Sequence, residues 1–321
     1  MTAMPAPEPI RIGISSCLLG QKVRFDGGHK RDAFLVDTFG AFVEWVPVCP
    51  EVELGLGTPR ESLRLVRKDG LVHMVNTKSG RDITVEMRRW SRARVDELSK
   101  ESLAGYVLKK DSPSCGMERV KVYGESGMAE KNGRGFFAEA LMERFPRLPV
   151  EEEGRLSDPR LRDNFVERVF AYVRLRELFR ARWTTGDLVR FHTAHKMALL
   201  AHSPQMYEEL GRLVATAKTL TRGDVETRYR ELFMDALAKM ATARKHTNVL
   251  QHMLGHFKEL LDADEKQELL GTVEDYRLGL VPLVVPLTLI KHHVRRRHVE
   301  YLAGQVYLDP HPKELMLRNH V

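Results

Sequence analysis

The first half of the chain alternates between short apolar runs and amphipathic segments. Runs rich in Ile, Val and aromatic residues, bounded by Gly or Pro, predict buried strands, whereas apolar residues spaced three and four apart predict helices. This alternation predicts an α/β domain with a mostly parallel, Rossmann-like sheet. The expected strands are 10–15, 41–48, 104–108, 120–123 and 148–152, with a hairpin at 63–75 around Asp69-Gly70 and helices at about 32–39, 85–103 and 135–145.

The second half of the chain shows helical periodicity only. Its start is marked by Ser157-Asp158-Pro159, which combines a capping residue with a proline in the first helical turn. We therefore expect two domains, an α/β domain over 1–156 and an all-α domain over 157–321. The expected helices are 160–181, 185–201, 204–219, 223–240, 242–259, 263–275 and 286–298.

The composition is that of an ordinary globular protein, with 321 residues, 43% hydrophobic and 30% charged. A net charge of +7 is too small to indicate a nucleic-acid-binding protein, so such a function depends on local basic patches. The N-terminus lacks the basic and apolar regions of a signal peptide, and the longest apolar stretch, 278–290, is interrupted by prolines. We expect a cytoplasmic protein without a membrane span.

The three cysteines all lie in the first half, each shortly after a predicted strand: Cys17 in SSCLLG, Cys49 in PVCPE and Cys115 in SPSCG. Because the carboxyl ends of parallel strands meet at one crevice, these thiols can converge there. Any one of them could be an inert buried thiol, but three at strand ends favour a metal centre. Zinc usually takes a fourth protein ligand, whereas an iron–sulfur cubane can be held by three thiolates with one iron left free.

Polar residues occupy the same loops. Glu51 follows Cys49 by two positions, Ser112 precedes Cys115 by three, and Asp26 lies in the glycine-rich segment RFDGGHK. A free iron beside such residues would be a Lewis-acid site. Each residue also has a plainer interpretation: Asp26 before Gly-Gly is typical of a turn, Glu51 could be a solvated loop charge, and Ser112 could cap a turn.

Three motifs, ISSCLLGQKVRFDGGHK, PVCPEVELGLGTPRE and LKKDSPSCG, together closely resemble the thiouracil desulfurase family over roughly residues 10–150. The resemblance implies a 4Fe-4S cluster on Cys17, Cys49 and Cys115. Its open iron would take the sulfur of a thiocarbonyl substrate in a desulfuration without net electron transfer. The resemblance also implies substrate anchoring and proton transfer by Glu51 and Ser112, and a motif position of the catalytic site at Asp26.

The second half resembles a helical domain often fused to this module, through FHTAHKMALLAHSPQMY at 191–207. The fused architecture resembles bacterial tRNA 4-thiouridine desulfidases. It implies that 1–156 is the catalytic domain, that 157–321 binds tRNA, and that 4-thiouridine in tRNA is the substrate, with no protein partner indicated. Two alternatives stay open: a desulfurase of free thiopyrimidines such as 2-thiouracil, and a non-catalytic, cluster-containing RNA-binding regulator.

A dense basic segment, KHHVRRRH at 291–298, is the candidate RNA contact in the second half. Its candidate residues are Lys291, Arg295, Arg296 and Arg297. A solvated helix face is the alternative. Three histidines at 192, 195 and 202 have spacings that place them near one helical face, but no HExxH pattern is present, so we expect hydrogen-bonded structural or RNA-facing histidines rather than metal ligands.

Overall fold

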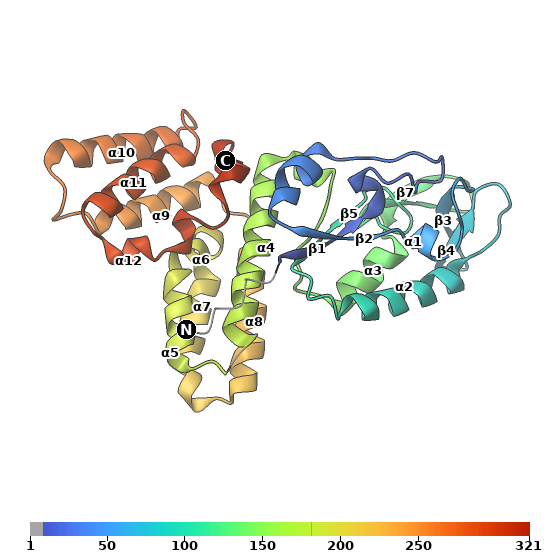
Figure 1. The fold of residues 1–321 in the computed structure, drawn as a ribbon, viewed down its shortest axis with the longest axis horizontal. Helices are drawn as coiled ribbons and strands as arrows, with labels where there is room; N and C mark the ends of the chain where they lie inside the picture. The colour runs from blue at the N-terminus through green and yellow to red at the C-terminus, as the bar shows by residue number, and fades with distance from the viewer. Residues whose placement is uncertain (1–8, 181) are drawn as a thin grey trace, which may run out of the picture. The chain divides into compact units, whose positions relative to one another are not determined.

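The computed structural model describes residues 9–180 and 182–321, and the chain divides into two compact units between Ser157 and Asp158. The first unit, blue to green in Figure 1, combines sheets and helices. The second, yellow-green to red, is built from helices. The predicted α/β region followed by an all-α region is thus confirmed.

A mostly parallel sheet was predicted, and sheet A is parallel throughout, with its strands in the order β2-β1-β5-β8. Strand β1 at its centre is buried from its second residue onward, as a strand covered on both faces must be. A glycine in β1, Gly13, gives the Tyr106 ring room, because a Cβ there would lie 2.1 Å from the ring. The strands are β1 Arg11–Ser15, β2 Glu44–Val48, β5 Gly105–Leu108 and β8 Val150–Glu152.

Sheet B is mixed, in the order β4-β3-β6-β7. Strands β3 and β4 form the predicted hairpin, and Asp69 (φ 50°) and Gly70 (φ 77°) turn it. Strand β6 runs parallel to β3, while β7 is antiparallel to β6 and was not predicted, because its sequence AEKNG is exposed and lacks apolar alternation. The strands are β3 Leu63–Lys68, β4 Leu71–Asn76, β6 Val120–Tyr123 and β7 Ala129–Gly133.

Helices of the first unit are fewer than its strands. Helix α1 (Pro50–Glu53) follows β2 directly, α2 (Thr84–Leu98) packs against α3 (Phe136–Arg144), and Met87 and Phe136 join the core beneath sheet B. The helix expected at about 32–39 is instead a π-helical turn over Phe34–Thr38 followed by a 3-10 turn. That second turn delays the start of β2 to Glu44.

The second unit contains nine α-helices among its described residues, and its described residues include no strand. The helix expected over 185–201 is divided at His195, and the end expected at residue 181 lies outside the described residues. The described part of the chain has no helix that is long and apolar enough to cross a membrane. The helices are α4 Pro159–Arg180, α5 Thr185–Ala194, α6 Lys196–His202, α7 Pro204–Ala215, α8 Arg222–Leu237, α9 Ala243–Gly255, α10 Ala263–Arg277, α11 Val284–Arg296 and α12 Glu300–Ala303.

Three histidines near the α5–α6 junction are buried and hydrogen-bonded, which confirms the structural interpretation. His192 Nδ1 bonds the Tyr229 hydroxyl at 3.2 Å, and His202 Nδ1 bonds the Lys239 carbonyl at 2.6 Å. His195 Nδ1 bonds the Phe191 carbonyl at 2.8 Å. Burial lowers the pKa of His192 to about 4 and of His195 to about 3, so both rings are neutral near pH 7.

Candidate active site

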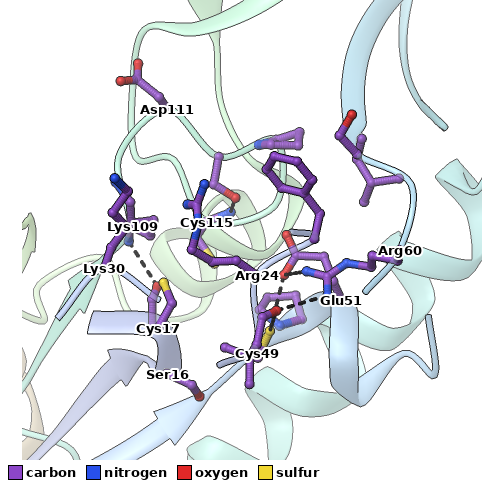
Figure 2. Close-up of a pocket in the computed structure, with 18 of the residues that line it drawn as sticks. Ser16, Cys17, Arg24, Lys30, Cys49, Glu51, Arg60, Lys109, Asp111 and Cys115 are labelled. Carbon is purple, nitrogen blue, oxygen red and sulfur yellow. Dashed lines mark hydrogen bonds and ion pairs between the residues drawn. The ribbon is translucent and has the colours of Figure 1, made fainter. Parts of the chain in front are cut away.

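The three cysteines converge on one cavity at the carboxyl ends of sheet A. Cys17 lies two residues after β1, Cys49 immediately after β2, and Cys115 in the loop that follows β5. Figure 2 shows these side chains around a common space, which has a volume of about 320 Å³. Glu51 and Ser112 line the same cavity. The strand-end convergence expected from the sequence is present.

The thiols are buried. Cys17, Cys49 and Cys115 are 8%, 9% and 4% exposed. Burial raises the pKa of Cys17 to about 11 and of Cys49 to about 12, and it also raises the pKa of Cys115. A nucleophilic cysteine needs the opposite shift, towards the thiolate. A bound cation would supply that shift, so these thiols suit ligands better than nucleophiles.

The donor set consists of three thiols, the soft ligands that iron–sulfur clusters take. Within residues 9–180 and 182–321, no group of three His, Cys, Asp or Glu side chains is gathered closely enough to hold one metal ion. In an iron–sulfur cluster each thiolate binds a different iron, so the thiols surround the cofactor rather than meet at one point. Three buried thiols around one cavity, in a chain with three cysteines in all, supply soft ligands of this kind.

Backbone contacts hold each cysteine in place. The Cys17 carbonyl accepts hydrogen bonds from the amides of Gly20 and Lys30, at 3.3 and 2.9 Å. The Cys49 amide donates to Glu53 Oε1 at 3.0 Å, and the Cys115 amide donates to Ser112 Oγ at 3.1 Å. Local hydrogen bonds therefore fix the backbone at each of the three thiols.

Glu51 is anchored and does not behave as a solvated loop charge. Its side chain is 13% exposed, and Ser114 Oγ donates to Glu51 Oε1. Its other oxygen lies 3.7 Å from a guanidinium nitrogen of Arg60, whose side chain is 8% exposed, and 3.5 Å from Cys49 Sγ. Figure 2 shows Glu51 between Arg60 and Cys49. The structure thus places an oriented carboxylate beside a candidate cluster ligand.

Ser112 and Ser114 extend this carboxylate into a hydrogen-bonded chain. Their hydroxyls lie 3.0 Å apart, so a proton can pass between Ser112 and Glu51 through Ser114. Sequence reasoning missed Ser114 and Arg60 as site residues. Both lie within the quoted motifs, in SPSC and GTPRE, so proximity to the cysteine motifs is the signal that could have found them.

Asp26 is not among the residues that line the cavity. Its Oδ1 accepts a hydrogen bond from the Gly28 amide at 3.0 Å, and that bond lowers its pKa. Its side chain is 49% exposed and lies 3.4 Å from Arg24 Nε. This is the turn role that the sequence left open, while a direct role in catalysis stays a prediction. The neighbouring Arg24 and Phe25 do line the cavity.

The sequence of the basic segment 291–298 suggested that no acids lie beside it, but acids from other parts of the second unit pair with two of its cations. Lys291 Nζ pairs with Asp309, and Arg297 donates to both carboxylate oxygens of Glu265, at 2.7 and 2.8 Å. Asp309 and Glu265 lie outside the segment 291–298, so the local sequence did not indicate these ion pairs. Arg295 and Arg296 are exposed, and no ion pair engages them within the described residues.

A Gly135→Ala substitution is expected to disturb the Cys115 loop. A Cβ at Gly135 would lie 2.4 Å from the carbonyl carbon of Ser114, which is backbone and must move. Overpacking of this kind costs about 1–3 kcal/mol. We expect a melting temperature lower by roughly 2–10 °C and a lower iron content, measured by calorimetry and metal analysis. Gly124→Ala is the control, since its Cβ would meet nothing closer than 3.8 Å, and equal behaviour of the two variants would contradict the prediction.

Comparisons with known proteins show which families and proteins the chain is similar to. A family model described as 2-thiouracil desulfurase matches residues 12–153, and one described as a protein of unknown function (DUF1722) matches 196–312. The chain is 35% identical to YbgA of Escherichia coli over 161 residues, covering 50% of this chain and 95% of YbgA. It is 34% identical to YbbK of Bacillus subtilis over 112 residues, 32% of this chain and 71% of YbbK. Among solved structures, the [4Fe-4S]-dependent thiouracil desulfidase TudS is 32% identical over 46% of this chain and 94% of TudS, with a TM-score of 0.39.

Proposed function

We propose, because this chain belongs to the 2-thiouracil desulfurase family through residues 12–153 and continues into a DUF1722 region, that it is an iron–sulfur-dependent desulfidase that converts 4-thiouridine in tRNA to uridine. The observation that carries the proposal is the convergence of three buried thiols, Glu51 and Ser112 on one cavity, with Ser114 linking Glu51 to Ser112 by hydrogen bonds. The overall reaction exchanges the sulfur of a C=S group for the oxygen of water and releases hydrogen sulfide. No oxidant or reductant is required.

Cys17, Cys49 and Cys115 would hold a 4Fe-4S cluster through three thiolates. When bound, the cluster would supply an open iron that acts as a Lewis acid towards the substrate's sulfur. The thiols lie deep in the cavity, whereas Arg24 and Lys110 line it at less buried positions. A thiocarbonyl base would therefore enter with its sulfur directed inward.

Glu51 is the general base in this proposal. It lies on the cavity wall in contact with Arg60, where its carboxylate can accept a proton from an attacking water. Ser114 fixes one carboxylate oxygen, and Ser112 can donate to or accept from a ring nitrogen or oxygen of the base. The serine chain would carry the proton back towards the product.

The second unit would bind the tRNA in this proposal. A base stacked within folded RNA must be exposed before it can enter a cavity of about 320 Å³, at a cost of a few kcal/mol that RNA contacts can offset. Arg295 and Arg296 are exposed and have no ion pair with any residue of 9–180 or 182–321, so they are suited to phosphate contacts. Such a substrate places the enzyme in the cytoplasm.

Turnover of thiolated tRNA tests the proposal. Anaerobically purified protein should be brown, and it should remove the near-ultraviolet absorption of 4-thiouridine while releasing an equal amount of sulfide. Protein that carries a cluster but leaves thiolated tRNA unchanged would contradict it and favour an RNA-binding regulator. The cavity volume also suits a free base. A kcat/KM that is higher for free 2-thiouracil than for tRNA would move the substrate to that class.

Replacing both Arg295 and Arg296 by Gln is expected to weaken tRNA binding by about tenfold at moderate salt and to lower the slope of log K against log salt by about 2. The control is the Lys291→Gln, Arg297→Gln pair, whose cations already contact Asp309 and Glu265. We expect the control to change binding less. Binding is measured by filter retention over a range of salt concentrations, and equal effects of the two double variants would move the RNA contact elsewhere.

A further inference from the structure

A second cavity adjoins the candidate active site on the outer face of sheet B. Its volume is about 520 Å³, and it shares four lining residues with the catalytic cavity. The shared residues are Ser62, Leu63, Asp111 and Pro113. The two spaces therefore adjoin at these residues, and the second forms a groove over strands β3, β6 and β7, the first and last of which are labelled in Figure 1.

Cations dominate this groove. Arg64 on β3, Lys121 on β6 and Lys131 on β7 line it and are exposed, and the described residues provide no carboxylate in ion-pair contact with any of the three. Among the residues that line this second cavity, Asp111 is the one carboxylate. The groove floor is therefore positive and available to an external anion.

Two of these cations lie opposite each other in sheet B, and their charge repulsion destabilises the strand pair. Lys121 and Lys131 are register partners across β6 and β7. Like charges directly opposite each other destabilise a strand pair. An anion bound between them would remove that repulsion, so the arrangement favours a polyanionic ligand.

An aromatic ring lies among the cations. Tyr123 on β6 is half-buried, lines the same cavity, and has the Arg64 guanidinium 5.5 Å from its ring centroid. Aromatic rings and guanidinium planes on a sheet surface are surfaces on which unpaired bases stack, and neighbouring cations follow the phosphates. This combination distinguishes a nucleic-acid surface from a site for a small anion.

We propose that the outer face of sheet B binds the RNA strand that flanks the target nucleotide. The inference rests on the proposed function, because it takes the adjoining cavity as the place where the thiolated base reacts. Arg64, Lys121 and Lys131 contact backbone phosphates, and Tyr123 stacks a neighbouring base. The catalytic unit itself thereby binds an unpaired RNA segment, independently of contacts made by the helical unit.

A triple variant, Arg64→Gln, Lys121→Gln and Lys131→Gln, tests this surface in the full chain. The probe is a short, fluorescein-labelled single-stranded oligonucleotide that contains one 4-thiouridine, and binding is followed by anisotropy at several salt concentrations. We expect the affinity to fall by about tenfold or more and the slope of log K against log salt to fall by about 2, since single strands lose about 0.7 per phosphate contact. The control is the triple variant Arg89→Gln, Arg92→Gln and Lys100→Gln, three exposed cations on or just beyond α2 with the same charge change.

Equal losses in the two triple variants would show general electrostatic attraction and overturn the inference. Unchanged affinity in the sheet B variant would also overturn it. Turnover of thiolated tRNA by the parent protein separates failure of this inference from failure of the proposed function. If parent protein fails to desulfurate thiolated tRNA, the proposed function fails, while the oligonucleotide measurement still decides whether this face binds RNA. Retained circular dichroism in both variants excludes unfolding as the cause.

Discussion

A Cys115→Ala variant is expected to contain no intact iron–sulfur cluster and to have no measurable desulfidase activity. Cys115 is 4% exposed, lines the cavity with the other two cysteines, and its loop is held by backbone bonds that the substitution leaves in place. Removing it leaves two thiolates in a chain that contains no other cysteine. The measurements are iron and acid-labile sulfide per chain, visible absorption, and release of sulfide from thiolated tRNA.

Two further variants separate ligand loss from unfolding. Cys115→Ser keeps the size of the side chain but replaces a soft donor by a hydroxyl, so it should lose the cluster as well. Ser91→Ala is the control, because it also removes one heavy atom from a fully buried side chain of the same unit. A fully active Cys115→Ala protein, or one that keeps its complete iron content, would show that this thiol is not a ligand.

The fold was largely predictable from the sequence because most elements carry a strong local pattern. Strands β1, β2 and β5 of sheet A are mostly apolar, and several helices of the second unit have clear caps, such as the Thr184–Asp187 capping box. Strand β7 was not predictable, because AEKNG forms a strand only through its pairing with β6. The break at His195 in the helix expected over 185–201 was not predictable either, because no proline or glycine lies beside it in the sequence.

The site was predictable where a residue lies close to a strand end and less so where long-range contacts decide. Glu51 lies at the cavity together with Cys49 because both residues closely follow the end of β2. Its partner Ser114 lies 63 residues away, so the serine–carboxylate chain could not be read from local sequence. For the same reason, the pairing of Arg297 with Glu265 was hidden, since only folding brings α10 and α11 together.

A Glu51→Gln variant is expected to keep its cluster and lose turnover by about 10²–10⁴-fold, the usual contribution of a general base. Glutamine has nearly the same shape, and its amide oxygen can still accept the hydrogen bond from Ser114. It cannot take a proton from water. Arg60 loses its ionic partner but retains hydrogen bonds to the carbonyls of Val23 and Gly57, at 3.0 and 2.9 Å, so the loop should hold its position.

The measurements for Glu51→Gln are kcat on thiolated tRNA and cluster content by visible absorption. Glu139→Gln is the matched control, because Glu139 is also a carboxylate paired with an arginine of the same unit, Arg88 at 2.7 Å, and it does not line the cavity. We expect the control to keep its turnover. Loss of iron in Glu51→Gln would assign Glu51 to supporting the cluster, and undiminished turnover with an intact cluster would transfer the proton chemistry to another group.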